Sequence, residues 1–222
     1  MPGDIVLGTG LSFASKDAAP GAPLWGRLND TRTRLLSVRG PQTLSQIQKH
    51  TGRKDIRPQY GDLGLTASLL IWPDLLPSSN PKHAVCVVPH ATDTILKKEA
   101  ASHKDPSVTV FSISPSEPKV LALALMDCQF VVSSSLHVLM TAETFGIPAR
   151  WYNGPDSNAV EKYLDYYEGI GANRTNASAR TLNDAIQMVP MASPVSLDTM
   201  LDVTTRLIQM FPFEELCQTG SK

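Results

Sequence analysis

The stretch that decides the fold is Gln129-Phe130-Val131-Val132-Ser133-Ser134-Ser135-Leu136-His137. Its first half, 129–133, is apolar and too short for a helix, so it suits a strand buried on both faces of a parallel sheet. Residues 136–145 continue as an apolar helix that Gly146 ends. A buried strand that passes directly into a helix is half of a βαβ unit, and the segment therefore predicts an α/β fold.

The same alternation of strand and helix extends in both directions from this segment. The further predicted elements are strands over 83–88, 108–113 and 149–152, and helices over 117–127, 158–168, 180–187 and 196–210. Regular alternation implies right-handed βαβ units. The predicted fold class is α/β, with a Rossmann-like parallel sheet and flanking helices.

The first fifty residues have a different texture. A strand at 5–7 is followed by a long loop over 12–33, rich in Ala, Gly, Pro and Asp. A second strand is predicted over 34–39, and Thr43 is expected to cap a helix over 44–51 that Gly52 ends. We therefore expect three parts: 1–52 as the remnant of an N-terminal Rossmann-like domain, 53–195 as a C-terminal Rossmann-like domain, and 196–222 as a C-terminal helix and tail.

Composition excludes several classes of protein. Among 222 residues, 20 Lys and Arg against 21 Asp and Glu give a net charge of −1, which removes the electrostatic case for a nucleic-acid partner. No apolar run is long enough to span a membrane, and the first residues do not form a signal peptide. The histidines lack metal-ligand spacing, so no metal site is expected. The three cysteines argue against a disulfide scaffold, and Cys86 and Cys128 suit a core.

The main candidate site is the turn 133–137, where a strand passes into a helix. Ligands of open α/β sheets bind beyond the carboxyl ends of strands, and a helix N-terminus offers unpaired N–H groups to an anion. Ser134 and Ser135 add hydroxyls, and His137 could donate a hydrogen bond or act as a general acid. Equally, the serines could only cap the helix while His137 packs against the sheet. The sequence leaves both interpretations open.

Two further residues are candidates for the same rim of the sheet. His90 follows the strand 83–88 directly, within reach of a ligand at His137, and Asp93 could orient it; an ordinary loop histidine is the alternative. Arg39 ends a strand before a Gly-Pro turn, and arginine binds carboxylates and phosphates through two parallel hydrogen bonds. For an isolated arginine, a surface or inter-domain salt bridge is the favoured interpretation.

A series of motifs along the chain resembles a known family. The motifs are Ser37-Val38-Arg39-Gly40-Pro41-Gln42-Thr43, Tyr60-Gly61-Asp62-Leu63-Gly64, Val88-Pro89-His90, Val132-Ser133-Ser134-Ser135-Leu136-His137, Ala142-Glu143-Thr144-Phe145-Gly146-Ile147-Pro148-Ala149, Lys162-Tyr163-Leu164-Asp165-Tyr166-Tyr167 and Phe211-Pro212-Phe213. Their order over roughly 34–213 is similar to that in polysaccharide pyruvyl transferases. Ser135 stands where many members carry an arginine, and Val138 where many carry a glycine.

The resemblance implies a GT-B-like transferase of two Rossmann-like domains, of which 53–195 would bind the donor. Such enzymes move the enolpyruvyl group of phosphoenolpyruvate onto two hydroxyls of a sugar or polysaccharide acceptor, giving a pyruvate ketal and phosphate. Arg39 would hold one anionic group of the donor, and the backbone near Ser135 and Leu136 the other. His137 would bind the donor and protonate its methylene carbon, with His90 in a lesser proton-handling role. The scheme requires no metal or organic cofactor.

Alternatives remain for both function and location. A nucleotide-sugar glycosyltransferase of the same fold would need an acidic donor-binding residue, for which Glu143 is the nearest candidate. A non-catalytic remnant that only binds ligand is the other alternative. Three glycosylation sequons, at Asn29, Asn173 and Asn176, are compatible with a Golgi or secretory lumen in a eukaryote, and a bacterial chain would be cytoplasmic.

Overall fold

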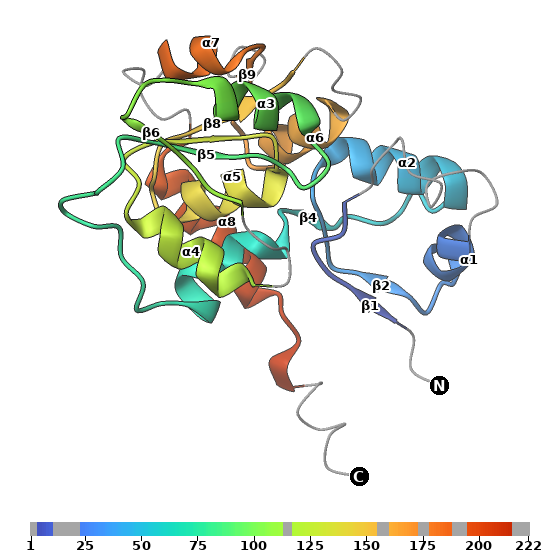
Figure 1. The fold of residues 1–222 in the computed structure, drawn as a ribbon. Coiled ribbons are helices and arrows are strands. Elements are labelled where there is room, and N and C mark those ends of the chain that lie inside the picture. Colours follow the sequence, from blue (N-terminus) through green and yellow to red (C-terminus); the bar gives the residue numbers. More distant parts are fainter. Residues whose placement is uncertain are drawn as a thin grey trace.

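A five-stranded parallel sheet forms the centre of the molecule (Figure 1). The computed structural model describes residues 4–10, 23–112, 117–154, 160–172, 178–187 and 195–214. Within these ranges the strands lie in the order β6-β5-β7-β8-β9. Their bounds are β5 Val85–Val88, β6 Val108–Val110, β7 Val131–Ser133, β8 Ala149–Tyr152 and β9 Ser178–Ala179. The predicted α/β class with a parallel sheet and flanking helices is confirmed.

Helices cover both faces of this sheet. Two of them, α3 (Thr94–Ser102) and α7 (Leu182–Gln187), pack with Val85, Val87 and Val132 in one core cluster. The other face carries the larger cluster, which four helices share: α4 (Pro118–Met126), α5 (Leu136–Thr144), α6 (Val160–Gly169) and α8 (Leu197–Gln209). In Figure 1, α3 and α7 lie above the sheet, and α4, α5 and α8 lie below it. The sheet is therefore buried on both sides, as its continuous apolar strands require.

Local sequence explains where these helices begin. Asp93 precedes α3 and accepts hydrogen bonds from the backbone N–H groups of Ile95 and Leu96, which would otherwise lack partners. Ser196 caps α8 in the same way through the N–H of Thr199. Pro118 stands in the first turn of α4, where its missing N–H costs nothing. Among the described residues, no helix is long and apolar enough to cross a membrane.

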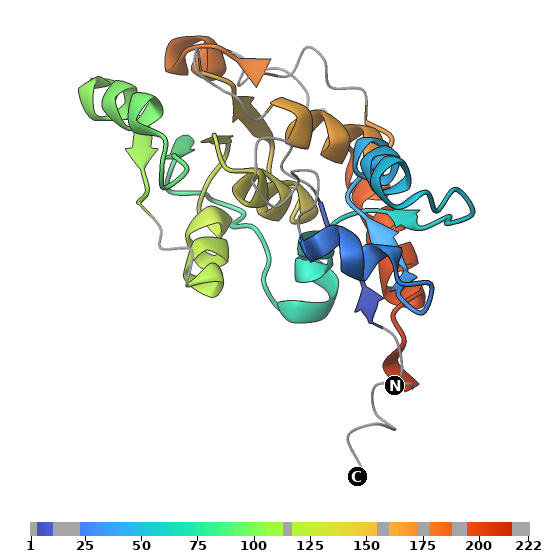
Figure 2. The same cartoon turned by 90° about the vertical axis from the view of Figure 1, so that its right-hand side faces the viewer.

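The N-terminal residues form a smaller unit beside the sheet (Figure 2). Its parallel strand pairs are β1 (Ile5–Val6) with β2 (Arg34–Leu35), and β3 (Ser37–Val38) with β4 (Gln59–Tyr60). Two helices, α1 (Pro23–Asn29) and α2 (Pro41–Thr51), share a separate core with Val38 and Ile56. The domain boundary predicted at residue 52 stays a prediction, although Ile56 and β4 pack with the N-terminal elements.

Several details of the N-terminal prediction are wrong. The predicted loop over 12–33 contains α1, in which Trp25 and Leu28 are buried; residues 12–22 lie outside the described residues. The strand predicted over 34–39 is two strands, because the chain pairs first with β1 and then with β4. Helix α2 begins at Pro41, so Thr43 lies inside the helix rather than capping it. Gly52 does end α2, in the left-handed conformation that glycine adopts without strain.

Elements that the sequence analysis did not predict follow β4. Residues Leu63–Thr66 form a 3-10 turn (η2), and Ala67–Ile71 a π-helical turn (η3). Thr144 and Thr204 both donate from Oγ1 to the carbonyl oxygen of Leu65, each at 2.9 Å. This carbonyl is buried in the turn, and the two hydroxyls from α5 and α8 fix η2 against the main core.

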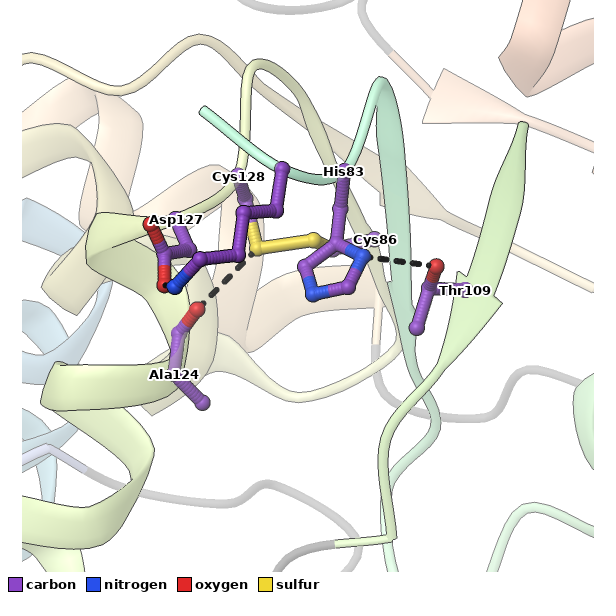
Figure 3. The surroundings of a disulfide bond; sticks show 7 residues. His83, Cys86, Thr109, Ala124, Asp127 and Cys128 are labelled. Atoms are coloured by element: carbon purple, nitrogen blue, oxygen red, sulfur yellow. Dashed lines mark hydrogen bonds and ion pairs between the residues drawn. A yellow bond between two sulfur atoms is a disulfide. The ribbon is translucent and has the colours of Figure 1, made fainter. Parts of the chain in front are cut away.

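A disulfide joins Cys86 in β5 to Cys128, just before β7 (Figure 3). Both residues are in the core, as predicted, but the bond between them was not expected from three cysteines without a paired spacing. They are 42 residues apart in sequence, and the adjacent strands bring their Cα atoms to 5.9 Å. Cys128 Sγ also lies 3.3 Å from the carbonyl oxygen of Ala124. The disulfide therefore fastens the two central strands to each other below their carboxyl ends.

Candidate functional site

The strand order creates a crevice between β5 and β7. From β5 the chain runs through α3 to β6 on one side, and then returns through α4 to β7 on the other side. Helix α3, which follows β5, packs on one face of the sheet, whereas α5, which follows β7, packs on the opposite face. The two connections therefore diverge beyond the carboxyl ends of β5 and β7. Such a topological switch point is where open α/β sheets bind ligands.

Hydrogen bonds connect the two loops at this switch point. Ser133 Oγ donates to the carbonyl oxygen of Val88 at 2.5 Å and accepts from the N–H of Ser135 at 2.9 Å. The N–H of His90 donates to Ser134 Oγ at 3.0 Å. Ser133 and Ser134 thus hold the β5 and β7 loops at a fixed separation, which is a structural role for two of the three serines.

The N-terminus of α5 is not capped by a side chain. Ser135 occupies the N-cap position, but its hydroxyl makes no capping hydrogen bond. The first N–H groups of a helix have no partner within the helix, and they carry a partial positive charge. The alternative interpretation, in which the serines only cap the helix, therefore does not hold for Ser135. The first N–H groups of α5, from Leu136 onward, lie at the end of the helix that begins at the crevice.

His90 and His137 line the same cavity, as the predicted common rim requires. This cavity has a volume of about 440 Å³, and Ser135 lies in its wall between the two histidines. The side chain of His137 is exposed, so it does not pack into the sheet. Two imidazoles and an uncapped helix terminus around one cavity form a site suited to an anionic ligand.

The neutral form of His90 is favoured. Burial lowers its pKa below the usual 6.5, and the positive charge of Lys162 lowers it further, against a smaller opposing effect of Asp93. The N–H of Thr92 donates to His90 Nδ1 at 3.3 Å, so the neutral ring carries its proton on Nε2. Asp93, which was expected to orient this ring, instead caps α3. His90 can therefore donate a hydrogen bond from Nε2 without carrying charge.

Lys162 in α6 is a cation that the sequence analysis did not single out. Its pKa is lowered, first by burial and then by the charge of Arg39. The ammonium lies 4.9 Å from the centre of the Tyr163 ring, and the Tyr163 hydroxyl donates to the carbonyl oxygen of Ser134 at 2.6 Å. Lys162 lies in the motif 162–167, but a lysine in an amphipathic helix carries no signal of its position relative to a distant loop.

Arg39 forms a salt bridge, which was the favoured interpretation of this residue in the sequence analysis. Its side chain is only 8% exposed, and Nε lies 3.3 Å from Oδ2 of the fully buried Asp165 in α6. Asp165 Oδ1 accepts from the N–H groups of Gln42 and Thr43, so this carboxylate caps α2 from another helix. Gly40 permits the close approach, because a Cβ there would collide with Asp165. The ion pair joins the N-terminal unit to the sheet, and a donor-binding role for Arg39 stays a prediction.

Two acidic residues of the sequence motifs, Glu143 and Asp62, have structural partners. Glu143 is 3% exposed and accepts hydrogen bonds from the hydroxyls of Tyr166 and Tyr167, at 3.0 and 3.3 Å. It does not line the cavity at His90 and His137. Asp62, in the motif 60–64, accepts through Oδ1 from the N–H of Gly64 at 3.0 Å, which is a side-chain to backbone contact typical of turns. Within the described ranges, no cluster of three or more His, Cys, Asp or Glu side chains could hold a metal ion.

Fold and site together define an α/β protein with a parallel sheet and a cavity, lined by His90 and His137, at the switch point of that sheet. Comparison with known proteins adds one relative: an uncharacterized protein of Acanthamoeba polyphaga mimivirus is 30% identical over 142 residues, which cover 62% of this chain and 48% of the viral protein. The chain thus spans about half the length of this curated relative. No protein-family model matches the chain, and no solved structure matches it significantly.

Proposed function

We propose that the chain is a polysaccharide pyruvyl transferase, or the donor-binding part of one, with the GT-B-like architecture that the sequence motifs imply. One observation carries the proposal: His90, His137 and the uncapped terminus of α5 converge on one cavity at the switch point of the sheet. Phosphoenolpyruvate carries a phosphate and a carboxylate, and a helix N-terminus with adjacent histidine and lysine side chains supplies the complementary charge.

Each group has a defined part in this scheme. The N–H groups at the start of α5, with Ser135 and Leu136, bind the phosphate of the donor. Lys162 does not line the cavity, but its charge, which acts on His90, adds positive potential that attracts the carboxylate from a distance. His90, in its neutral form, donates a hydrogen bond from Nε2 to an oxygen of phosphoenolpyruvate or of the sugar. Arg39 contributes positive potential behind Lys162, because its guanidinium is already paired with Asp165.

The reaction balances with the groups that are present. One sugar hydroxyl attacks the enol carbon of phosphoenolpyruvate, and His137 delivers a proton to the methylene carbon, which becomes a methyl group. A second hydroxyl then forms the other C–O bond of the ketal as the C–O bond to phosphate breaks. Of the two hydroxyl protons, one replaces the proton that His137 gave and the other leaves with phosphate. His137 suits this role because it is exposed in the cavity wall.

A titration with phosphoenolpyruvate tests the proposal. A ligand that binds the folded state of the chain but not its unfolded state raises the melting temperature. Since a hydrogen bond to a charged group contributes about 1.5–3 kcal/mol, His137→Asn should weaken binding by about 10- to 100-fold. Lys162→Met removes only a charge that does not line the cavity, so it should weaken binding less. The matched control is Lys82→Met, because Lys82 is exposed, pairs with Asp127 and precedes the opposite end of β5.

The outcomes distinguish the proposed function from its alternatives. Stabilisation by phosphoenolpyruvate that both site variants weaken and Lys82→Met leaves intact supports donor binding. Phosphate release in the presence of sugar acceptors then separates an enzyme from a binding remnant. Stabilisation by a nucleotide sugar but not by phosphoenolpyruvate would overturn the proposal, as would an equal response of all three variants. Glu143 makes the nucleotide-sugar alternative weaker, because its carboxylate serves the core.

A further inference from the structure

The cavity at His90 and His137 has two chemically different ends. Ser135 and the two histidines come from the loop after β5 and the start of α5, and we call this side the polar end; Ile71, Trp72 and Leu121 come from η3 and α4, and we call this side the apolar end. Of the described residues that line the cavity, none is Asp, Glu, Lys or Arg. We propose that the apolar end binds an apolar substituent attached to the acceptor sugar, an aglycone, while the sugar hydroxyls meet the donor at the polar end. This inference rests on the proposed function and names its acceptor class.

The size of the cavity is the first argument. Cavities of about 300–1,000 Å³ enclose drug-sized ligands. The volume here, about 440 Å³, lies in that range, and phosphoenolpyruvate is much smaller than such a ligand. The donor, held at the start of α5, therefore leaves most of the cavity for a second group.

The chemistry of the walls decides what that second group is. The apolar end is built by η3 with Ala67 and Ile71, by α4 with Leu121, and by Val138 of α5. A sugar hydroxyl placed against these aliphatic side chains would lose its hydrogen bonds to water without replacement, which costs about 1–3 kcal/mol for each group. An apolar group gains free energy at the same position. A bare, hydroxyl-rich oligosaccharide is thus a poor occupant of this end.

The apolar surface continues outside the cavity. Ile71 in η3 lines the cavity and is also 55% exposed, so its side chain is accessible from outside. On α4, which forms the facing wall, Val120 is 52% exposed. An exposed apolar side chain in the wall of a cavity, with a further exposed apolar residue next to the lining residue Leu121, favours contact with an apolar ligand that extends beyond the cavity. An aglycone can therefore enter the cavity from this side and leave the sugar at the histidines.

Paired glycosides test the inference. For galactose, glucose and mannose, binding of the phenyl glycoside is compared with that of the methyl glycoside, by calorimetry in the presence of phosphoenolpyruvate. Burial of a phenyl group should make the phenyl glycoside of the accepted sugar bind about 10-fold more tightly or better. Ile71→Asn should bring the ratio close to one. Leu70→Asn is the matched control, since Leu70 lies on the same turn but does not line the cavity.

A second variant guards against a folding defect. Ile71 is largely exposed, so Ile71→Asn should fold; Leu121→Asn removes the facing wall independently. Equal binding of phenyl and methyl glycosides, or no binding of any phenyl glycoside, overturns the inference. If phosphoenolpyruvate still binds in that case, the proposed function stands without it. If phenyl glycosides bind and phosphoenolpyruvate does not, the proposed function fails while the apolar site remains.

Discussion

Helix α6 contributes to two polar regions that differ in how completely their groups are paired. Asp165 is fully buried, and its two carboxylate oxygens accept from Arg39, Thr43 and the backbone N–H groups that begin α2. One turn earlier, Lys162 lies only partly buried over the Tyr163 ring, with its charge acting on His90. The first region is closed to solvent, whereas in the second Lys162 is partly exposed and its charge acts on His90, which lines the cavity.

The difference between these regions separates a structural role from a chemical one. Partners surround the Asp165 carboxylate within the chain, so a ligand would have to break existing hydrogen bonds to reach it. Burial lowers the pKa values of Lys162 and His90, so the protein disfavours the charged form of both side chains, and a bound anion would favour it. We therefore expect substitutions in the first region to change the free energy of unfolding, and those in the second to change binding.

The largest effect is expected for Asp165→Ala. This change leaves the buried Arg39 guanidinium without its carboxylate and removes the acceptor for the first turn of α2. Loss of one partner from a buried ion pair costs about 3–5 kcal/mol. Urea denaturation should show this loss, whereas Asp202→Ala, which breaks the exposed Asp202–Arg206 pair, should cost less than about 1 kcal/mol. Equal effects of the two changes would contradict the distinction between the regions.

Loss of the disulfide should be the next largest effect. Cys86 and Cys128 close a chain segment of 42 residues, and removal of such a bond lowers the free energy of unfolding by about 2–4 kcal/mol. The Cys86→Ala/Cys128→Ala double variant and the reduced native chain should unfold at similarly lower urea concentrations. The bond lies below the β5 and β7 loops, so its loss tests whether the site depends on a rigid strand pair. Free thiols at both positions in chain isolated under oxidising conditions would be contrary to this expectation.

A much smaller change in stability is expected for Lys162→Met. The ammonium is desolvated and lies near the like charge of Arg39, both of which disfavour its charged form. Methionine keeps the unbranched apolar part of the side chain against Tyr163. The free energy of unfolding should therefore change by less than about 1 kcal/mol, or rise slightly, while phosphoenolpyruvate affinity falls. A loss as large as that of Asp165→Ala would place Lys162 with the structural residues instead.

Four of the five strands of the sheet were predictable from sequence, because they belong to apolar runs between helices with clear ends; β9, only two residues long, was not predicted. β7, α5 and β8 all lie within their predicted segments, and Gly52 ends α2 as expected. Helix α1 was missed because Pro23 and Gly26 interrupt its short apolar pattern. Its Trp25 stacks on His50 of α2, and a contact with another helix cannot be predicted from the local sequence. The Gly-Pro pair at Gly40 was interpreted as a stop, although proline also favours the first turn of a helix.

The site was predictable only in part. The histidines follow apolar strands, and parallel strands carry such residues to one edge, so their common cavity follows from the pattern. The partners of Arg39 and Glu143 lie in α6, more than a hundred residues from Arg39, and no local pattern reports such pairs. The same holds for the disulfide, whose pairing depends on the position of β5 next to β7.

The smallest expected effect is on the titration of His90. Its pKa lies below the usual 6.5 because of burial and the Lys162 charge, so Lys162→Met should raise it, whereas Asp93→Asn should lower it. Both shifts can be followed through the ring Cε1–H signal in NMR spectra.

The sign of the accompanying pH dependence follows from linkage. In the unfolded chain His90 takes up a proton near its usual pKa of 6.5, and in the folded chain it does so at lower pH. The unfolded state therefore binds more protons between these two values. The contribution of His90 to stability is fully present above pH 6.5 and is lost as the pH falls from 6.5 through the folded-state pKa.

Lys162→Met should narrow the pH range between the folded-state pKa of His90 and 6.5, because it removes part of the repulsion between Lys162 and a protonated His90. An anion bound in the crevice acts in the same direction, so saturating phosphoenolpyruvate should also raise the His90 pKa. If neither Lys162→Met nor phosphoenolpyruvate moved the His90 signal, Lys162 and His90 would not share one electrostatic site. The region of α6 around Lys162 would then have no more part in ligand binding than the region around Asp165.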